Sequence, residues 1–171
     1  MSALYTPPWL QEAIKNDGVK EGPGAKDNPV VLKYYADAGF PGIKHDEVAW
    51  CAAFVGAMLK RRSLVPSGSL AARSYLTYPQ LHVPKFGAIG VKRRTGGFSY
   101  QGHVGFVVAW DGPHIWMLGG NQRDMVNVAR FPHDEFLGFF APKGFDMKLL
   151  SDAPKSPPSN LKALTGPVTE G

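Results

Sequence analysis

Cysteine is almost missing from this chain of 171 residues, which holds a single one, Cys51. One thiol cannot form an intramolecular disulfide, so the fold must be held together by its core. Long apolar runs are missing as well. The longest uncharged apolar runs, such as Ala49 to Leu59 and His103 to Trp110, are too short to span a bilayer. We therefore expect no membrane insertion.

Acidic residues are outnumbered, since 14 Asp and Glu face 19 Lys and Arg and leave a net charge of +5. This surplus favours anionic partners, such as a bacterial wall or a nucleic acid, without choosing between them.

Several motifs are also absent. There is no zinc-finger spacing, His-Glu-x-x-His motif, phosphate loop, dinucleotide fingerprint or Gly-x-Ser-x-Gly elbow. We expect no metal and no cofactor. The amino terminus lacks a basic region followed by an apolar stretch, so we expect synthesis in the cytoplasm without a signal peptide.

What is present suits one globular domain. Hydrophobic residues make up 44% of the chain and charged residues 19%, which is enough apolar surface for a core. The 20 glycines and 15 prolines indicate many turns. We predict one domain over residues 1–145, and a Pro- and Ser-rich tail over residues 146–171 that we expect to be flexible. The default oligomeric state is a monomer.

The first half of the chain favours helices and the second half favours strands. Capping residues, glycines and apolar spacing predict helices over 7–14, 30–38, 49–62 and 69–76. Short β-prone runs predict strands over 86–92, 103–110, 114–118, 126–131 and 136–140. Asp111-Gly112 is a hairpin signal between two of these strands. Helices followed by an antiparallel sheet predict an α+β fold.

Cys51 is the first candidate for chemistry, because it lies at the amino end of the strongest predicted helix. A thiolate is the nucleophilic form of cysteine, and a helix amino terminus stabilises its negative charge and lowers the thiol pKa. The free N–H groups of the first turn could also hold an oxyanion. The alternative is a buried structural cysteine.

His103 is the candidate base, because it begins an apolar strand directly after a glycine-rich loop. A neutral imidazole there could take the proton of Cys51 and return it to a leaving amine. The alternative is a histidine whose nitrogens merely satisfy hydrogen bonds at a strand end.

Asn121 is the candidate third residue. If the strands on either side of Asp111-Gly112 pair, then His103 and residues 119–122 meet at one edge of the sheet. Asn121 could then accept a hydrogen bond from the imidazole and fix its tautomer, completing a Cys-His-Asn arrangement. The alternative is a loop asparagine that stabilises its own turn.

These segments resemble the CHAP and NlpC/P60 cysteine peptidases and amidases, which cut peptidoglycan. The matching segments are Trp50-Cys51-Ala52-Ala53-Phe54-Val55, Gly102-His103-Val104-Gly105-Phe106-Val107 and Gly119-Gly120-Asn121-Gln122. A compact branch found in phage and prophage genomes is similar over residues 8–142, including residues 71–76, 128–132 and 137–139. The resemblance implies a papain-like core, with Cys51 as nucleophile, His103 as base and Asn121 as the orienting residue.

The chain departs from these relatives in three places. Relatives usually carry Pro-Gly-Asp before the first strand of the sheet, where this chain has Lys85-Phe86-Gly87-Ala88. Many relatives have Glu, Asp or His as the third residue, whereas Asn121 would orient the ring without adding charge. There is also no Asp-rich run like the calcium loop of some CHAP endolysins.

Three further residues are candidates for substrate binding. Trp50 and Trp116 could line a groove for sugar or peptide, although a tryptophan is more often part of the core. Gln122 could donate a hydrogen bond to the substrate, or only to its own loop.

The sequence therefore predicts a peptidoglycan hydrolase, an amidase or endopeptidase that works through an acyl-enzyme. Such a protein would be a phage endolysin, released by a holin, or an antibacterial effector delivered by a secretion apparatus. Which bond is cut stays open. One alternative is a non-catalytic wall-binding module on the same fold. A second is a basic nucleic-acid-binding domain, for which only Phe98 and Tyr100 supply aromatics in the basic loop, so we expect no nucleic-acid partner.

Overall fold

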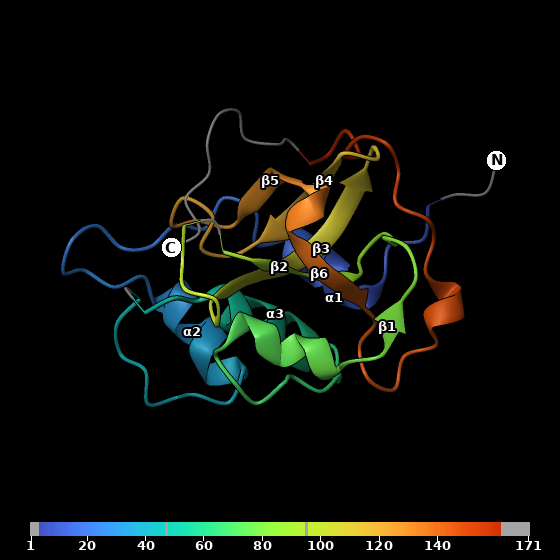
Figure 1. Ribbon diagram of the computed structural model, residues 1–171. Helices are drawn as coiled ribbons and strands as arrows, with labels where there is room; N and C mark the ends of the chain where they lie inside the picture. The colour runs from blue at the N-terminus through green and yellow to red at the C-terminus, as the bar shows by residue number, and fades with distance from the viewer. Residues whose placement is uncertain (1–3, 47, 95, 162–171) are drawn as a thin grey trace.

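The computed structural model describes residues 4–46, 48–94 and 96–161. Over these residues the protein is an α+β structure with a six-stranded antiparallel sheet (Figure 1). The strand order is β1-β6-β2-β3-β4-β5. The strands are β1 (Gln80–Leu81), β2 (Ile89–Arg93), β3 (Gly102–Trp110), β4 (His114–Gly119), β5 (Asn127–Pro132) and β6 (Phe136–Phe140).

The helices precede the sheet in the chain, as predicted. They are α1 (Pro8–Ile14), α2 (Pro29–Asp37) and α3 (Cys51–Arg61), and α2 and α3 pack side by side (Figure 1). The side chain of Asn28 caps α2 by accepting a hydrogen bond from Val30 N at 2.9 Å. The predicted helix over 69–76 is a 3-10 helix, η1 (Ala72–Thr77).

Helix α3 is the buried helix of the fold. Every residue from Cys51 to Leu59 is buried, and the charged residues Lys60 and Arg61 come only in its last turn. There they complement the negative end of the helix dipole. The helix packs on β3, where the rings of Phe54 and Phe106 lie 6.3 Å apart.

The β3–β4 hairpin fixes which residues meet at the sheet edge. Phe106 pairs with Leu118 and Trp110 with Ile115, across a turn in which Gly112 has a φ of 104°. On the other side of β3, Lys92 of β2 pairs with His103. The end of β2, the start of β3, the end of β4 and the start of β5 therefore lie at the same end of the sheet. The hairpin signal predicted this for His103 and residues 119–122. Strand β1, two residues long, was not predicted.

The tail is only partly what we expected. Ser151 O accepts a hydrogen bond from Phe86 N, and Pro154 O accepts one from Trp110 N, each at 2.8 Å. Leu150 and Leu161 are buried in the core. The prediction of a flexible tail is therefore wrong for residues 150–161, because backbone pairing and two leucines hold this segment on the domain. Residues 162–171 lie outside the described part of the chain.

Within the described ranges, none of the helices combines the length and the apolar character that crossing a bilayer requires.

Candidate functional site

Cys51 is the first residue of α3, and its side chain is almost fully covered, with 6% exposed. The preceding residue, Trp50, is the N-cap of the helix and is completely buried. Its indole Nε1 donates to Glu21 Oε1 at 2.6 Å, which ties the loop before α2 to the amino end of α3. The thiol thus belongs to the first turn of α3, at the positive end of the helix dipole.

Tyr35 belongs to the surroundings of Cys51. Burial raises the pKa of the Tyr35 hydroxyl well above its ordinary value, and the carboxylates of Glu21 and Asp46, together with Cys51 in its thiolate form, raise that pKa further. The hydroxyl therefore stays protonated and donates to the carbonyl oxygen of Val48.

His103, the second residue of β3, is completely buried. Its ring lies 5.5 Å from the ring of Phe131. Its Nε2 lies 2.9 Å from Oε1 of Gln122 in the β4–β5 connection. A histidine at the start of a strand is thereby held by both a neighbouring strand and a turn.

The hydrogen bonds of Gln122 determine the tautomer of His103. Gln122 Nε2 donates to the backbone oxygen of Asn127 at 2.9 Å and to Asn127 Oδ1 at 3.0 Å. Asn127 Nδ2 in turn donates to the backbone oxygen of Gln122 at 2.6 Å. Backbone oxygens can only accept, so both amide orientations are fixed and Gln122 Oε1 faces the imidazole. His103 Nε2 must then carry the proton, and Nδ1 of the neutral ring holds the basic lone pair.

Gln122, and not Asn121, is therefore the residue whose side chain accepts the hydrogen bond from His103. The sequence analysis predicted this role for Asn121. Asn121 has a left-handed backbone, with φ of 60°, and its Oδ1 is buried without a hydrogen-bond partner. The left-handed residue turns the chain, so the next residue, Gln122, is the one that reaches the ring. Gln122 is itself completely buried, and both ends of its amide are already paired, with His103 and with Asn127.

Gly120 joins the β4–β5 connection to the amino end of α3. A Cβ added to Gly120 would lie 2.7 Å from Phe54 Cβ and 2.7 Å from Trp50 Cζ3. The backbone at 120 thus packs directly on the residues around Cys51, while Gln122, two residues later, holds His103. One short turn connects the helix end that carries the thiol with the strand end that carries the imidazole.

The two tryptophans do not line a groove beside His103. Trp50 is completely buried, so it is a core residue that supports the helix end. Trp116 pairs with Ala109, six residues along β3 from His103 and hence roughly 20 Å away. It lies beside His114, with 6.2 Å between the ring centroids, at the opposite end of the hairpin. The structure separates Trp116 from the other candidates.

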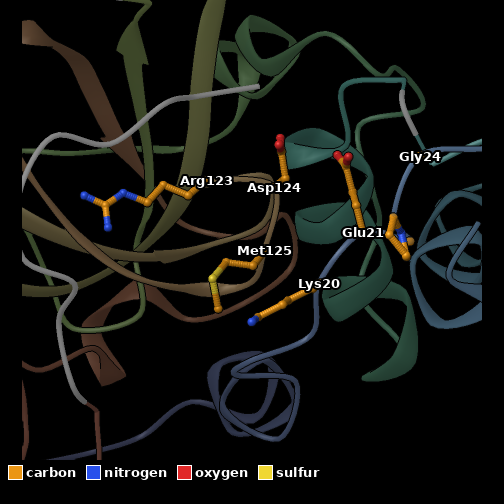
Figure 2. A pocket seen from close by; sticks show the side chains of 8 residues that line it. Lys20, Glu21, Gly24, Arg123, Asp124 and Met125 are labelled. Atoms are coloured by element: carbon orange, nitrogen blue, oxygen red, sulfur yellow. The ribbon is translucent and has the colours of Figure 1, made fainter.

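A pocket of about 580 Å³ adjoins the same turn (Figure 2). The carboxylates of Glu21 and Asp124 point to the same side, whereas the side chain of Arg123 extends away from them (Figure 2). Two residues that line this pocket adjoin the candidate site. Glu21 accepts the hydrogen bond from Trp50, and Arg123 directly follows Gln122 in the chain. Its lining residues are Lys20, Glu21, Gly22, Pro23, Gly24, Arg123, Asp124 and Met125.

The described residues contain no group of three or more His, Cys, Asp or Glu side chains placed to hold a metal ion.

Sequence reasoning missed Asn127 and did not connect Gln122 with His103. Both are polar residues at the ends of apolar strands, which is a signal that could have drawn attention to them. Choosing between neighbours such as Asn121 and Gln122 requires the backbone conformation of the turn, which no residue pattern supplies.

The chain matches no protein-family model, no curated protein and no solved structure at a meaningful level of similarity.

Proposed function

We propose that this protein is a cysteine hydrolase that cuts an amide bond of peptidoglycan, on a papain-like fold. The observation that carries the proposal is the Gln122–Asn127 network, which holds His103 in the tautomer with a basic Nδ1. A structural histidine needs any hydrogen-bond partner, but a general base needs one fixed nitrogen with a lone pair. The choice of peptidoglycan rests on the resemblance to wall-cutting enzymes and on the net charge of +5.

The proposed reaction begins when His103 Nδ1 takes the proton of the Cys51 thiol. The thiolate attacks the amide carbonyl carbon, and the backbone N–H groups at the amino end of α3 stabilise the oxyanion. The intermediate collapses to a thioester as the carbon–nitrogen bond breaks, and the amine leaves with the proton from His103. Water, deprotonated by His103, then hydrolyses the thioester and restores the thiol.

In this mechanism Gln122 is a positioning residue. It keeps the proton on Nε2 through both steps, and its Oε1 accepts from the ring in the neutral and in the charged state. Because an amide carries no charge, it stabilises the imidazolium less than a carboxylate would.

The direct test is to incubate purified sacculi with the wild-type protein and with Cys51→Ala, and to analyse soluble products by mass spectrometry. We expect new fragments from the wild type alone, and their new termini will identify the bond that is cut. Because Cys51 is the only cysteine, alkylation of the wild type with iodoacetamide is a matched control that should abolish release at one label per chain. Full fragment release by Cys51→Ala would refute the mechanism.

A second candidate, binding of a polyanion without catalysis, is favoured by one observation. Phe98 and Tyr100 are 69% and 71% exposed, and their rings stack 5.6 Å apart in a basic loop. Exposed aromatics beside arginines suit single-stranded nucleic acid or a wall polymer. Retention on sacculi without fragments would favour a wall-binding module, and a steeply salt-dependent shift of an oligonucleotide would favour nucleic acid.

A further inference from the structure

Asn121 is a buried amide that the mechanism above does not use. Its side chain is 1% exposed, and its Oδ1 has no hydrogen-bond partner. The neighbouring amides of Gln122 and Asn127 are both paired. Buried polar groups are nearly always hydrogen-bonded, because leaving one unpaired costs its hydration without compensation. An unpaired acceptor inside a candidate active site therefore points to a ligand that supplies the missing donor.

The position of Asn121 is fixed by its two neighbours. Gly120 packs against Trp50 and Phe54, and Phe54 lies one helical turn from Cys51 on the same side of α3. Gln122 holds His103. Consecutive Cα atoms are 3.8 Å apart, so Asn121 stands between the residue packed on the helix end and the residue bonded to the imidazole. The residue that carries the unpaired acceptor thus adjoins both the residue packed on the amino end of α3 and the residue that holds His103.

Backbone conformation does not account for this amide. Asparagine is one of the residues that tolerates a φ of 60°, but glycine adopts that conformation with less strain and buries no polar group. If the turn alone were required, the buried amide would be a cost without a benefit.

We propose that the side-chain amide of Asn121 binds a peptide group of the substrate next to the bond that Cys51 attacks. A peptide group offers an N–H to Oδ1 and a carbonyl oxygen to Nδ2, so it satisfies both ends of the amide. An oxyanion or a carboxylate would instead face Oδ1 with a lone pair. The inference rests on the proposed function, and it assigns Asn121 to substrate recognition rather than to orienting His103.

The test replaces Asn121 with glycine, which keeps the left-handed backbone and removes the amide. We expect Asn121→Gly to retain its Tm, to raise KM for a soluble disaccharide tetrapeptide about tenfold and to leave kcat unchanged, as loss of a ground-state hydrogen bond predicts. Ser63→Gly is the matched control, because Ser63 also has a left-handed φ of 62° but lies exposed beyond the carboxyl end of α3. It should change neither KM nor kcat.

A modified substrate sharpens the result. Methylating the recognised peptide nitrogen should raise KM for the wild type by a similar factor. The same methylation should leave the KM of Asn121→Gly unchanged, because the substitution and the methylation remove the same hydrogen bond. Additive losses for every methylated position would overturn the proposal.

A binding measurement tests the role of Asn121 independently of whether the protein hydrolyses peptidoglycan. Titration calorimetry of the same tetrapeptide would use Cys51→Ala and Cys51→Ala combined with Asn121→Gly. About tenfold weaker binding of the double variant supports the role of Asn121 even if the wild type releases no fragments. Equal binding by the two proteins, or no binding by either, overturns it even if sacculi are cut.

Discussion

Two connections meet at the sheet edge where β3 begins, and they are built in opposite ways. In the β4–β5 connection, residues 120–126, the side-chain amides of Asn121 and Gln122 have almost no exposed surface. The β2–β3 connection, described for residue 94 and residues 96–101, carries two of the most exposed aromatic rings of the protein. Both lie at the same end of the sheet, on the left in Figure 1.

The hydrogen bonds of the two connections differ in what replaces them when they break. Gln101 Oε1 accepts from Phe98 N at 2.9 Å in an exposed turn, and water can take over that contact. Gln122 Oε1 accepts from His103 Nε2 at the same distance, but no water reaches it. A buried hydrogen bond fixes geometry because its loss leaves a desolvated group unpaired. The β4–β5 connection is therefore suited to orient a reacting group, and the β2–β3 connection to touch something outside the protein.

The strongest test of this comparison makes the same substitution in both connections. Gln122→Met keeps the length of the side chain and leaves the Nε2–H of His103 and the backbone oxygen of Asn127 unpaired. We expect the free energy of unfolding to fall by about 3 kcal/mol, and hydrolysis to fall on the order of 100-fold as the base loses its orientation. Urea unfolding and fragment release from sacculi measure the two effects.

Gln101→Met is the matched control, and it should cost less than about 1 kcal/mol because water replaces the lost acceptor. Equal losses in the two variants would show that the connections do not differ as described.

A second pair of substitutions compares packing. Gly120→Ala places a methyl group 2.7 Å from both Phe54 Cβ and Trp50 Cζ3, neither of which can move without disturbing α3. We expect a loss of about 2 kcal/mol. Gly97→Ala meets Gln101 Oε1 at 2.4 Å, but that atom is the far end of a side chain that can swing into solvent. This variant should lose less than about 0.5 kcal/mol, and a larger loss than in Gly120→Ala would contradict the comparison.

The smallest effect is expected at the exposed rings. Replacing Phe98 and Tyr100 together by serine should change the free energy of unfolding by less than about 0.5 kcal/mol, since neither ring contributes to the core. Urea unfolding with an unchanged slope is the measurement. A drop of Tm by several degrees would mean that the stacked pair supports the fold rather than facing outward.

Much of the fold could be read from local signals. A capping residue before the helix predicted over 30–38 indicated the start of α2, and the cap hydrogen bond of Asn28 is present. Asp111-Gly112 predicted the hairpin that brings His103 and residues 119–122 to one edge, and the β3–β4 register confirms it. These features depend on neighbours in the chain, so a single sequence carries them.

Other features depended on contacts between distant segments and were missed. The tail was expected to be flexible, yet Ser151 and Pro154 pair with Phe86 and Trp110, far away in the sequence. Trp50 and Trp116 were grouped as possible groove residues, but the register separates Trp116 from His103 by the length of a strand. No composition or periodicity encodes these pairings.

The sequence by itself determined the nucleophile candidate, the base candidate and the edge of the sheet where the base lies, because a helix start, a strand start and a hairpin are local patterns. Only the tertiary structure decided which amide serves the base. Asn121 and Gln122 are adjacent and chemically alike. The left-handed backbone at Asn121 and the hydrogen bond from Gln122 to the carbonyl oxygen of Asn127 place the Gln122 amide, and not the Asn121 amide, against the imidazole of His103. That outcome depends on burial, since only in a desolvated site does one hydrogen bond fix the position of a proton.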